Sequence, residues 1–483
     1  MATATTMSFL LLWVALMALS IHALESTRMV DVLNDKKKHK RVAKKKRYGD
    51  VQELFLEQPL NHFRSSPSTF SQRYFVSHRF ASNNDTAFLC VGGEGPALDA
   101  SVLVDSVHCS DMLEMARQVG ATVYALEHRY YGESYPELEL TNENLVYLSS
   151  RQALEDLARF VKSHPQHTTW ITWGGSYPGM LAAWARLKHP DLIHAAVSAS
   201  APLQAVVQFP GYQRHVGQVL PCRLLVQAGH QALLAEVEDP ARQGELAVEL
   251  SLCNASALVD PMNRQLLLGD GLFYWGVQEN DPSCLGDYCN IDKKCAALEA
   301  FDGSPRDAIV WMYHELQGDE CLEVDWQGTM DYIRNPAHRG VRSWLWQTCN
   351  EFGFYQTCGD GCLFGTHTID QDLQLCEYAF GVEAAFVFRN VDATLAHYGG
   401  LDLESSRILS ITGTIDPWSE QALLPPTRDP SLPLYSVPGA SHHFWTHAPK
   451  DTDDEAIVQA RGIIYETVRG WLAEHRQEIA QLH

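Results

Sequence analysis

Short, continuous apolar runs that end at polar or glycine-rich turns constrain the fold of this chain most. They cover residues 87–91, 121–126, 168–173, 195–199, 408–411 and 434–437. Buried parallel strands have this continuous pattern, whereas half-exposed strands alternate apolar and polar residues. Apolar residues at helical spacing lie between the runs, at 154–161, and again after them, at 457–471. Strands that alternate with helices predict a parallel sheet covered on both faces.

The N-terminal residues have the composition of a targeting segment. Residues 1–24 contain no Asp, Glu, Lys or Arg, and 9–19 are all apolar. This run is too short to span a bilayer, so it predicts a signal peptide ending near residue 23, with an N-terminal membrane anchor as the alternative. The segment 24–47, with a basic run at 36–47, is either a disordered arm or a pro-segment. We expect a secretory protein, secreted or lysosomal, with no stable membrane insertion after cleavage.

The middle of the chain, from 205 to 400, breaks the alternation of strands and helices. It is rich in Cys, Trp and Gln and contains helical pieces such as 223–237. We predict one inserted, mostly helical domain at 205–400, between two core parts at 48–204 and 401–483. The chain has 12 Cys, and an even number in a secretory chain favours disulfides. Acceptor tripeptides for glycosylation begin at Asn84 and Asn254.

Composition argues against several classes of ligand. With 37 basic and 59 acidic residues the formal charge is −22, and phosphate repels such a chain, so we expect no nucleic-acid partner. We also expect no metal or cofactor. The cysteines contain no CxxC pair, and the His443-x3-His447 spacing has no evident carboxylate partner.

The segment 170–180 predicts a catalytic serine. An apolar strand runs into Gly174-Gly175-Ser176, and helical residues follow. This strand, sharp turn and helix form the nucleophile elbow of serine hydrolases, whose strained serine needs small neighbours. Pro178 stands where the usual pattern has glycine, but the first turn of a helix tolerates proline. The N–H of Tyr177, which would bind an oxyanion, remains. The alternative is an ordinary glycine turn.

A serine nucleophile needs a base and an acid that orients it. Asp416 follows the fifth apolar run, and His442 and His443 follow the sixth. Both loops lie at carboxyl ends of predicted strands, where open α/β sheets place their sites. Adjacent residues point in different directions, so at most one histidine should reach the serine. Gly93, in the glycine-rich loop after the first run, would donate a second oxyanion N–H.

These motifs resemble the serine peptidase family of prolyl carboxypeptidase, dipeptidyl peptidase II and thymus-specific serine protease. The resemblance runs from about 50 to 475 and is closest to the thymus-specific branch. Besides the elbow and the two loops above, the matching segments are 58–63, 72–75, 92–96, 127–134 and 346–353.

The resemblance implies an α/β-hydrolase core with a helical cap, and exopeptidase action with a preference for proline. By motif, Ser176 is the nucleophile, Asp416 the acid and His442 the base, and Met180 and Trp418 line the proline pocket. Two departures are Pro178, noted above, and a Phe-Trp pair after the two histidines where Leu-Asp is usual.

Two other functions stay open: a lipid or ester hydrolase on the same fold, and a non-catalytic binding protein that keeps it. The substrate is expected to be a peptide. The sequence leaves open which peptide terminus is recognised, and also whether the chain forms a homodimer.

Overall fold

The computed structural model describes residues 49–482, except for 66, 83–84, 319, 364 and 426–430. The predicted signal peptide, the basic segment and the acceptor Asn84 lie outside the described residues. Two compact units make up the rest. The described part of the core unit consists of 49–205, 336–352 and 390–482, and that of the helical unit consists of 206–335 and 353–389.

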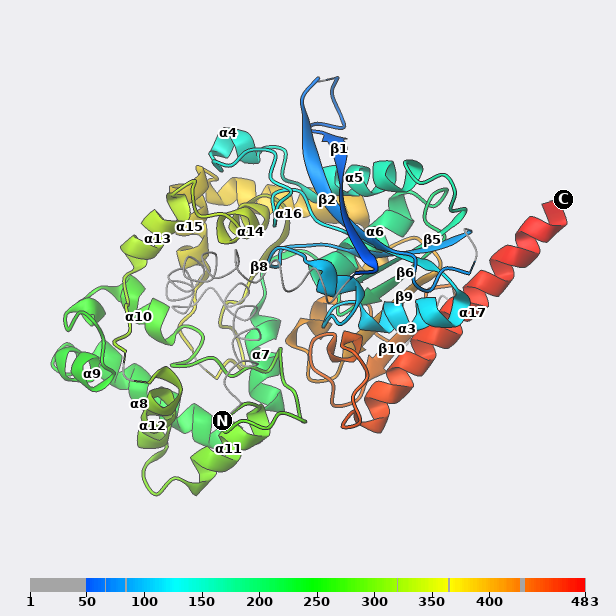
Figure 1. Ribbon diagram of the computed structural model, residues 1–483. Helices are drawn as coiled ribbons and strands as arrows, with labels where there is room; N and C mark the ends of the chain where they lie inside the picture. The colour runs from blue at the N-terminus through cyan, green and yellow to red at the C-terminus, as the bar shows by residue number, and fades with distance from the viewer. Residues whose placement is uncertain are drawn as a thin grey trace. The chain divides into compact units, whose positions relative to one another are not determined.

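The core unit contains one eight-stranded sheet with the strand order β1-β2-β4-β3-β5-β6-β9-β10 (Figure 1). The six predicted runs form the parallel strands β3 to β6, β9 and β10, as expected. β1 and β2 add an antiparallel edge. This is the sheet of an α/β hydrolase, so the predicted fold class is confirmed. The strands are β1 Val51–Pro59, β2 Thr69–Ser77, β3 Thr86–Val91, β4 Thr122–Leu126, β5 Thr169–Gly175, β6 Ala195–Ala199, β9 Ile408–Gly413 and β10 Leu434–Val437.

Helices cover both faces of this sheet, as continuous apolar strands require. Ile171 and Trp173 of β5 belong to one apolar cluster with side chains of α3 and α17. The residue between them, Thr172, points to the opposite face and donates to the carbonyl of Ala182 in α6 (3.1 Å). The helices are α3 Ser110–Val119, α4 Asn142–Leu145, α5 Ser150–Lys162, α6 Tyr177–Lys188, α14 Val341–Gln347 and α17 Glu455–Leu482, with a π-helical turn at Thr348–Phe352.

Two buried ion pairs fix the loop that follows β4. The Nε and Nη2 atoms of Arg129 each lie 2.6 Å from a different oxygen of Asp156, which also accepts from His62 Nε2 at 2.7 Å. Arg73 Nη2 lies 2.7 Å from Glu127 Oε1. Buried charges are tolerated only when they are paired in this way. Several residues of the matching segments therefore have a structural role in these ion pairs, and no catalytic role is needed to explain their presence.

The helical unit is mostly α-helical, with one short parallel pair of strands. Four of its disulfides are Cys222–Cys295, Cys253–Cys321, Cys284–Cys289 and Cys358–Cys362. Its elements are β7 Val206–Gln208, α7 Pro210–Val219, α8 Arg223–Glu238, α9 Gln243–Glu249, α10 Pro261–Leu268, α11 Ile291–Ala300, α12 Pro305–Gln317, α13 Trp326–Arg334, β8 Gly353–Tyr355 and α15 Ile369–Phe380, while α16 Ala384–Tyr398 has residues of both units.

The first two of these disulfides join residues 73 and 68 positions apart. Closing loops of this length stabilises a fold by restricting the unfolded chain. The predicted domain limits at 204 and 400 stay a prediction. The core unit includes 336–352 and 390–400. The acceptor Asn254 is exposed on the helical unit.

Candidate active site

The predicted nucleophile, Ser176, lies at the junction of β5 and α6. Its backbone has φ 62° and ψ −132°, a strained conformation for a residue with a side chain. Its N–H donates to the carbonyl of Ala199 at 2.9 Å. A Cβ atom at Gly174 would lie 2.2 Å from the carbonyl oxygen of Pro178, so only glycine fits there. The local geometry is therefore that of a nucleophile elbow.

The predicted acid and base meet through a hydrogen bond. His442 Nδ1 lies 2.9 and 3.0 Å from the two carboxylate oxygens of Asp416, and both side chains are buried. The carboxylate can only accept, so Nδ1 carries the hydrogen and Nε2 is left as an acceptor. Nε2 is buried without a hydrogen-bond partner among the described residues, Ser176 included. Such bonds are often long in an enzyme without substrate and tighten when substrate binds.

The second histidine of the pair points elsewhere. The ring of His443 lies beside Gly175, where an added Cβ would come within 2.9 Å of it, and its N–H donates to Ser200 Oγ at 2.8 Å. Burial, and then the nearby His442 and His108, hold the pKa of His443 well below its usual value. The geometry therefore pairs Asp416 with the first histidine.

His447, the second histidine of the His443-x3-His447 spacing, has a carboxylate partner that the sequence did not predict. His447 Nε2 lies 2.8 Å from Asp453 Oδ1. Across the part of the chain that the structure describes, no three His, Cys, Asp or Glu side chains are grouped to hold a metal ion.

The glycine-rich loop after β3 packs against the start of α6. Gly92 N–H donates to the carbonyl of Leu126 at 2.9 Å, so this N–H is already used. A Cβ atom at Gly93 would lie 2.4 Å from Cγ of Pro178. Tyr177 is the first residue of α6, where backbone N–H groups have no partner within the helix. The structure therefore places the loop of Gly93 next to the helix turn that carries the Tyr177 N–H.

Glu94, in the same loop, is a site residue that the sequence analysis did not single out. Its side chain is only 3% exposed, and neither carboxylate oxygen has a hydrogen-bond partner among the described residues. Burial raises the pKa of Glu94 to about 7, and the charge of His442 acts in the opposite direction. A carboxyl group whose pKa is raised to about 7 and that interacts with the candidate base is typical of catalytic sites. The one sequence signal that could have indicated Glu94 is its place between two glycines after a strand.

The two residues expected to line a proline pocket are both buried. Met180 is the fourth residue of α6, and its N–H donates to the carbonyl of Ser176 at 3.0 Å. The ring of Trp418 lies 6.2 Å from that of His442, and the backbone N–H of Trp418 donates to Asp416 Oδ1 at 3.0 Å. Their role in binding stays a prediction.

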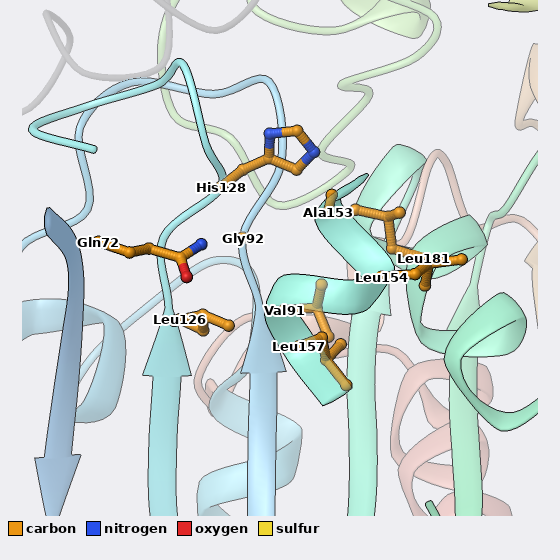
Figure 2. A pocket seen from close by; sticks show the side chains of 9 residues that line it. All are labelled: Gln72, Val91, Gly92, Leu126, His128, Ala153, Leu154, Leu157 and Leu181. Atoms are coloured by element: carbon orange, nitrogen blue, oxygen red, sulfur yellow. The ribbon is translucent and has the colours of Figure 1, made fainter. Parts of the chain in front are cut away.

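A small cavity lies beside the glycine-rich loop, lined among others by Gln72, Gly92 and His128 (Figure 2). Its volume is about 10 Å³, room for roughly one water molecule. It is therefore too small to hold a peptide side chain.

The fold and these groups together define a hydrolase of the serine type. The chain belongs to the family described as Serine carboxypeptidase S28, whose model matches residues 58–464. It is 34% identical to the thymus-specific serine protease of Mus musculus over 459 residues, 87% of each chain, and 34% identical to that of Homo sapiens over 457 residues, 86% of each. It is 24% identical over 476 residues to the lysosomal Pro-X carboxypeptidase of Pongo abelii, covering 89% of this chain and 90% of the relative.

The family match confirms the predicted resemblance. It also confirms the predicted class of enzyme, a serine peptidase. No helix in the described ranges is long and apolar enough to cross a membrane.

Proposed function

We propose that this protein is a serine exopeptidase that cleaves peptides next to proline by way of an acyl-enzyme. The observation that carries the proposal is the pairing of His442 with the buried Asp416, which leaves Nε2 as a free acceptor. The strained backbone of Ser176 at the elbow supports its role as the nucleophile. The loop of the two histidines reaches this elbow, because the ring of His443 lies beside Gly175.

In the proposed reaction each side chain or backbone group has one defined task. Ser176 Oγ attacks the peptide carbonyl while His442 Nε2 takes its proton and then gives it to the leaving amine. Asp416 fixes the imidazole tautomer and stabilises the imidazolium. The N–H groups of Tyr177 and Gly93 bind the oxyanion, and each donor is worth roughly 3–4 kcal/mol. Water then releases the acyl group by the same steps.

The proline preference is proposed from the resemblance and from the surroundings of the site. Proline has a compact ring and no N–H, so it suits an apolar slot with aromatic walls. Met180 and Trp418 are the side chains proposed to form that slot. The name of one relative, a Pro-X carboxypeptidase, agrees with this preference.

Labelling with a fluorophosphonate tests the catalytic assignment. The wild-type protein should be labelled, and Ser176→Ala should not. Ser198→Ala is a matched control, because Ser198 is also a buried serine, but its hydroxyl donates to the carbonyl of Gly179 at 2.9 Å. Equal labelling of the wild type and Ser176→Ala would refute the assignment.

A peptide panel tests the specificity. Peptides with an Xaa-Pro unit at one end, blocked at either terminus or at both, separate the two exopeptidase types from an endopeptidase. Replacing proline with alanine in the same peptides measures the preference for the ring. Rapid cleavage of simple esters with no cleavage of any peptide would favour the lipid or ester hydrolase instead.

We further propose a secretory route ending outside the cell or in the lysosome. The apolar N-terminal run and the disulfides support it, as does the lysosomal name of one relative. A homodimer stays a prediction.

A further inference from the structure

The hydroxyl group of Tyr177 is part of a buried chain of hydrogen bonds whose directions can be worked out. His128 Nδ1 lies 2.6 Å from the carbonyl oxygen of Arg129, so Nδ1 carries a hydrogen and Nε2 is the acceptor. Tyr177 then donates its hydroxyl hydrogen to Nε2 at 3.0 Å. Gln347 Nε2 donates to the Tyr177 oxygen at 2.9 Å, and Gln347 Oε1 accepts from the hydroxyl of Tyr131 at 2.7 Å.

The neutral form of His128 keeps these directions unambiguous. Burial lowers the pKa of His128 to about 4. The imidazole is therefore neutral under ordinary conditions, and its Nε2 needs the hydrogen that Tyr177 supplies. In this chain of bonds every donor meets an acceptor, which is how buried polar groups specify one arrangement.

The segment that provides Gln347 also packs on the ring of Tyr177. The ring centroids of Trp344 and Phe352 lie 5.8 and 5.2 Å from that of Tyr177. Glu351 ties the same segment to the start of α5, because its carboxylate accepts from both the N–H and the hydroxyl of Ser150 at 2.7 to 3.0 Å. Residues 341–352 are thus a clamp on the residue that follows the candidate nucleophile.

The backbone of Tyr177 has a special need for such a clamp. Its N–H is the proposed oxyanion donor and, at the first position of α6, it has no partner within the helix. The preceding residue is in a strained conformation, and the carbonyl oxygen of the same peptide unit, that of Ser176, accepts from Met180 N–H at 3.0 Å. The hydrogen bonds of the Tyr177 side chain are therefore a second restraint on this peptide unit.

We propose that Gln347 is a positioning residue for the oxyanion site, acting through the side chain of Tyr177. The inference rests on the proposed function, since it assumes that the Tyr177 N–H binds the oxyanion. Gln347 touches no substrate in this proposal. Gln347 keeps the backbone N–H of Tyr177 in position for the oxyanion. Its loss should therefore weaken binding of the transition state more than binding of the substrate.

The test compares Gln347→Met, which keeps the length of the side chain and removes its polar atoms, with Tyr177→Phe, which removes one hydroxyl and leaves the backbone N–H. Each should lower kcat by roughly 10- to 100-fold, less than the loss of a whole oxyanion donor, with KM changed less than threefold. The double variant should be no slower than the slower single variant, because both changes break one chain of bonds.

Gln278→Leu is the matched control. Gln278 is a buried glutamine that accepts from a tyrosine hydroxyl, that of Tyr212, at 3.0 Å in the helical unit. It should lower the Tm without lowering kcat. If Gln347→Met does not fold, Tyr177→Phe decides the question by its kcat alone.

The outcomes separate this inference from the proposed function. Turnover that survives Ser176→Ala refutes the proposed function. Turnover that needs Ser176 but keeps its kcat within twofold in Gln347→Met or, failing that, in Tyr177→Phe refutes the positioning role alone. A rise in KM at constant kcat, or losses that multiply in the double variant, would also refute it.

Discussion

Gly93→Ala should disable the site through a single contact. The added Cβ would lie 2.4 Å from Cγ and 2.6 Å from Cδ of Pro178. Non-bonded carbon atoms approach to about 3.5 Å, so the two groups must move apart by about 1 Å. The ring of Pro178 cannot rotate away, because it is closed on the backbone of the first turn of α6. The loop that carries Gly93 must therefore move.

The size of the effect follows from this displacement. A shift of about 1 Å in a catalytic group costs on the order of 100-fold in rate, or about 2.7 kcal/mol of transition-state stabilisation. That is close to the loss of one oxyanion donor. The strain should also lower the free energy of unfolding by about 1–3 kcal/mol, as overpacking does. We expect kcat to fall about 100-fold with little change in KM, and the Tm to fall by several degrees.

The contact also predicts a suppressor. Pro178→Ala removes both colliding ring atoms, and the next atom near the added Cβ is the backbone nitrogen at 3.4 Å, an ordinary separation. The double variant Gly93→Ala, Pro178→Ala should therefore regain most of the kcat of Pro178→Ala. Gly462→Ala is the control, since a Cβ there meets nothing within 4 Å. Steady-state kinetics on a cleaved peptide and thermal melts measure all five proteins. A kcat for Gly93→Ala within twofold of the wild type, or a double variant no faster than Gly93→Ala, would refute the steric reasoning.

Three further changes test other parts of the core unit. Asp416→Asn should lower kcat by about 1,000- to 10,000-fold, because an amide no longer fixes the tautomer of His442; a fall below tenfold would contradict the triad. Burial raises the pKa of Asp111 from 3.8 to about 7, so its contribution to stability is present below pH 3.8 and is lost as the pH rises through about 7. Asp111→Asn should therefore gain stability relative to the wild type between pH 4 and 8, by at most about 4 kcal/mol in denaturant melts, and a pH-independent difference would contradict this. Asp156→Asn leaves the buried guanidinium of Arg129 without a full charge partner and should cost about 3–5 kcal/mol in the same melts; a cost below 1 kcal/mol would count against the buried pair.

The parallel part of the sheet could be predicted because its strands are buried on both faces. β3 to β6 contain continuous apolar residues, and the predicted limits agree with the observed ones within two residues. β1 was missed because most of its residues are exposed and its sequence, Val51–Pro59, mixes charged and apolar residues without strict alternation. Edge strands of this kind depend on pairing with a neighbour, which a local pattern does not contain.

The candidate site was predictable in its chain order but not in its fine geometry. Spacing alone could not choose between His442 and His443, since the choice depends on the left-handed backbone of His443, with φ 40°. The burial of Glu94 arises from loop packing, for which the sequence has no periodic signal. The bond between Gln347 and Tyr177 joins residues 170 positions apart, and it exists only because the segment 336–352 belongs to the core unit.

The departure at Pro178 can now be explained physically. The usual elbow has a glycine two positions after the serine. Here that position holds a proline ring, and the facing residue across the contact is Gly93, whose missing Cβ supplies the space. The glycine at position 93 therefore lets the loop and the helix approach closely although position 178 holds a ring. It follows that positions 93 and 178 should be read as a pair, and that a bulky residue is tolerated at either one only when the other is small.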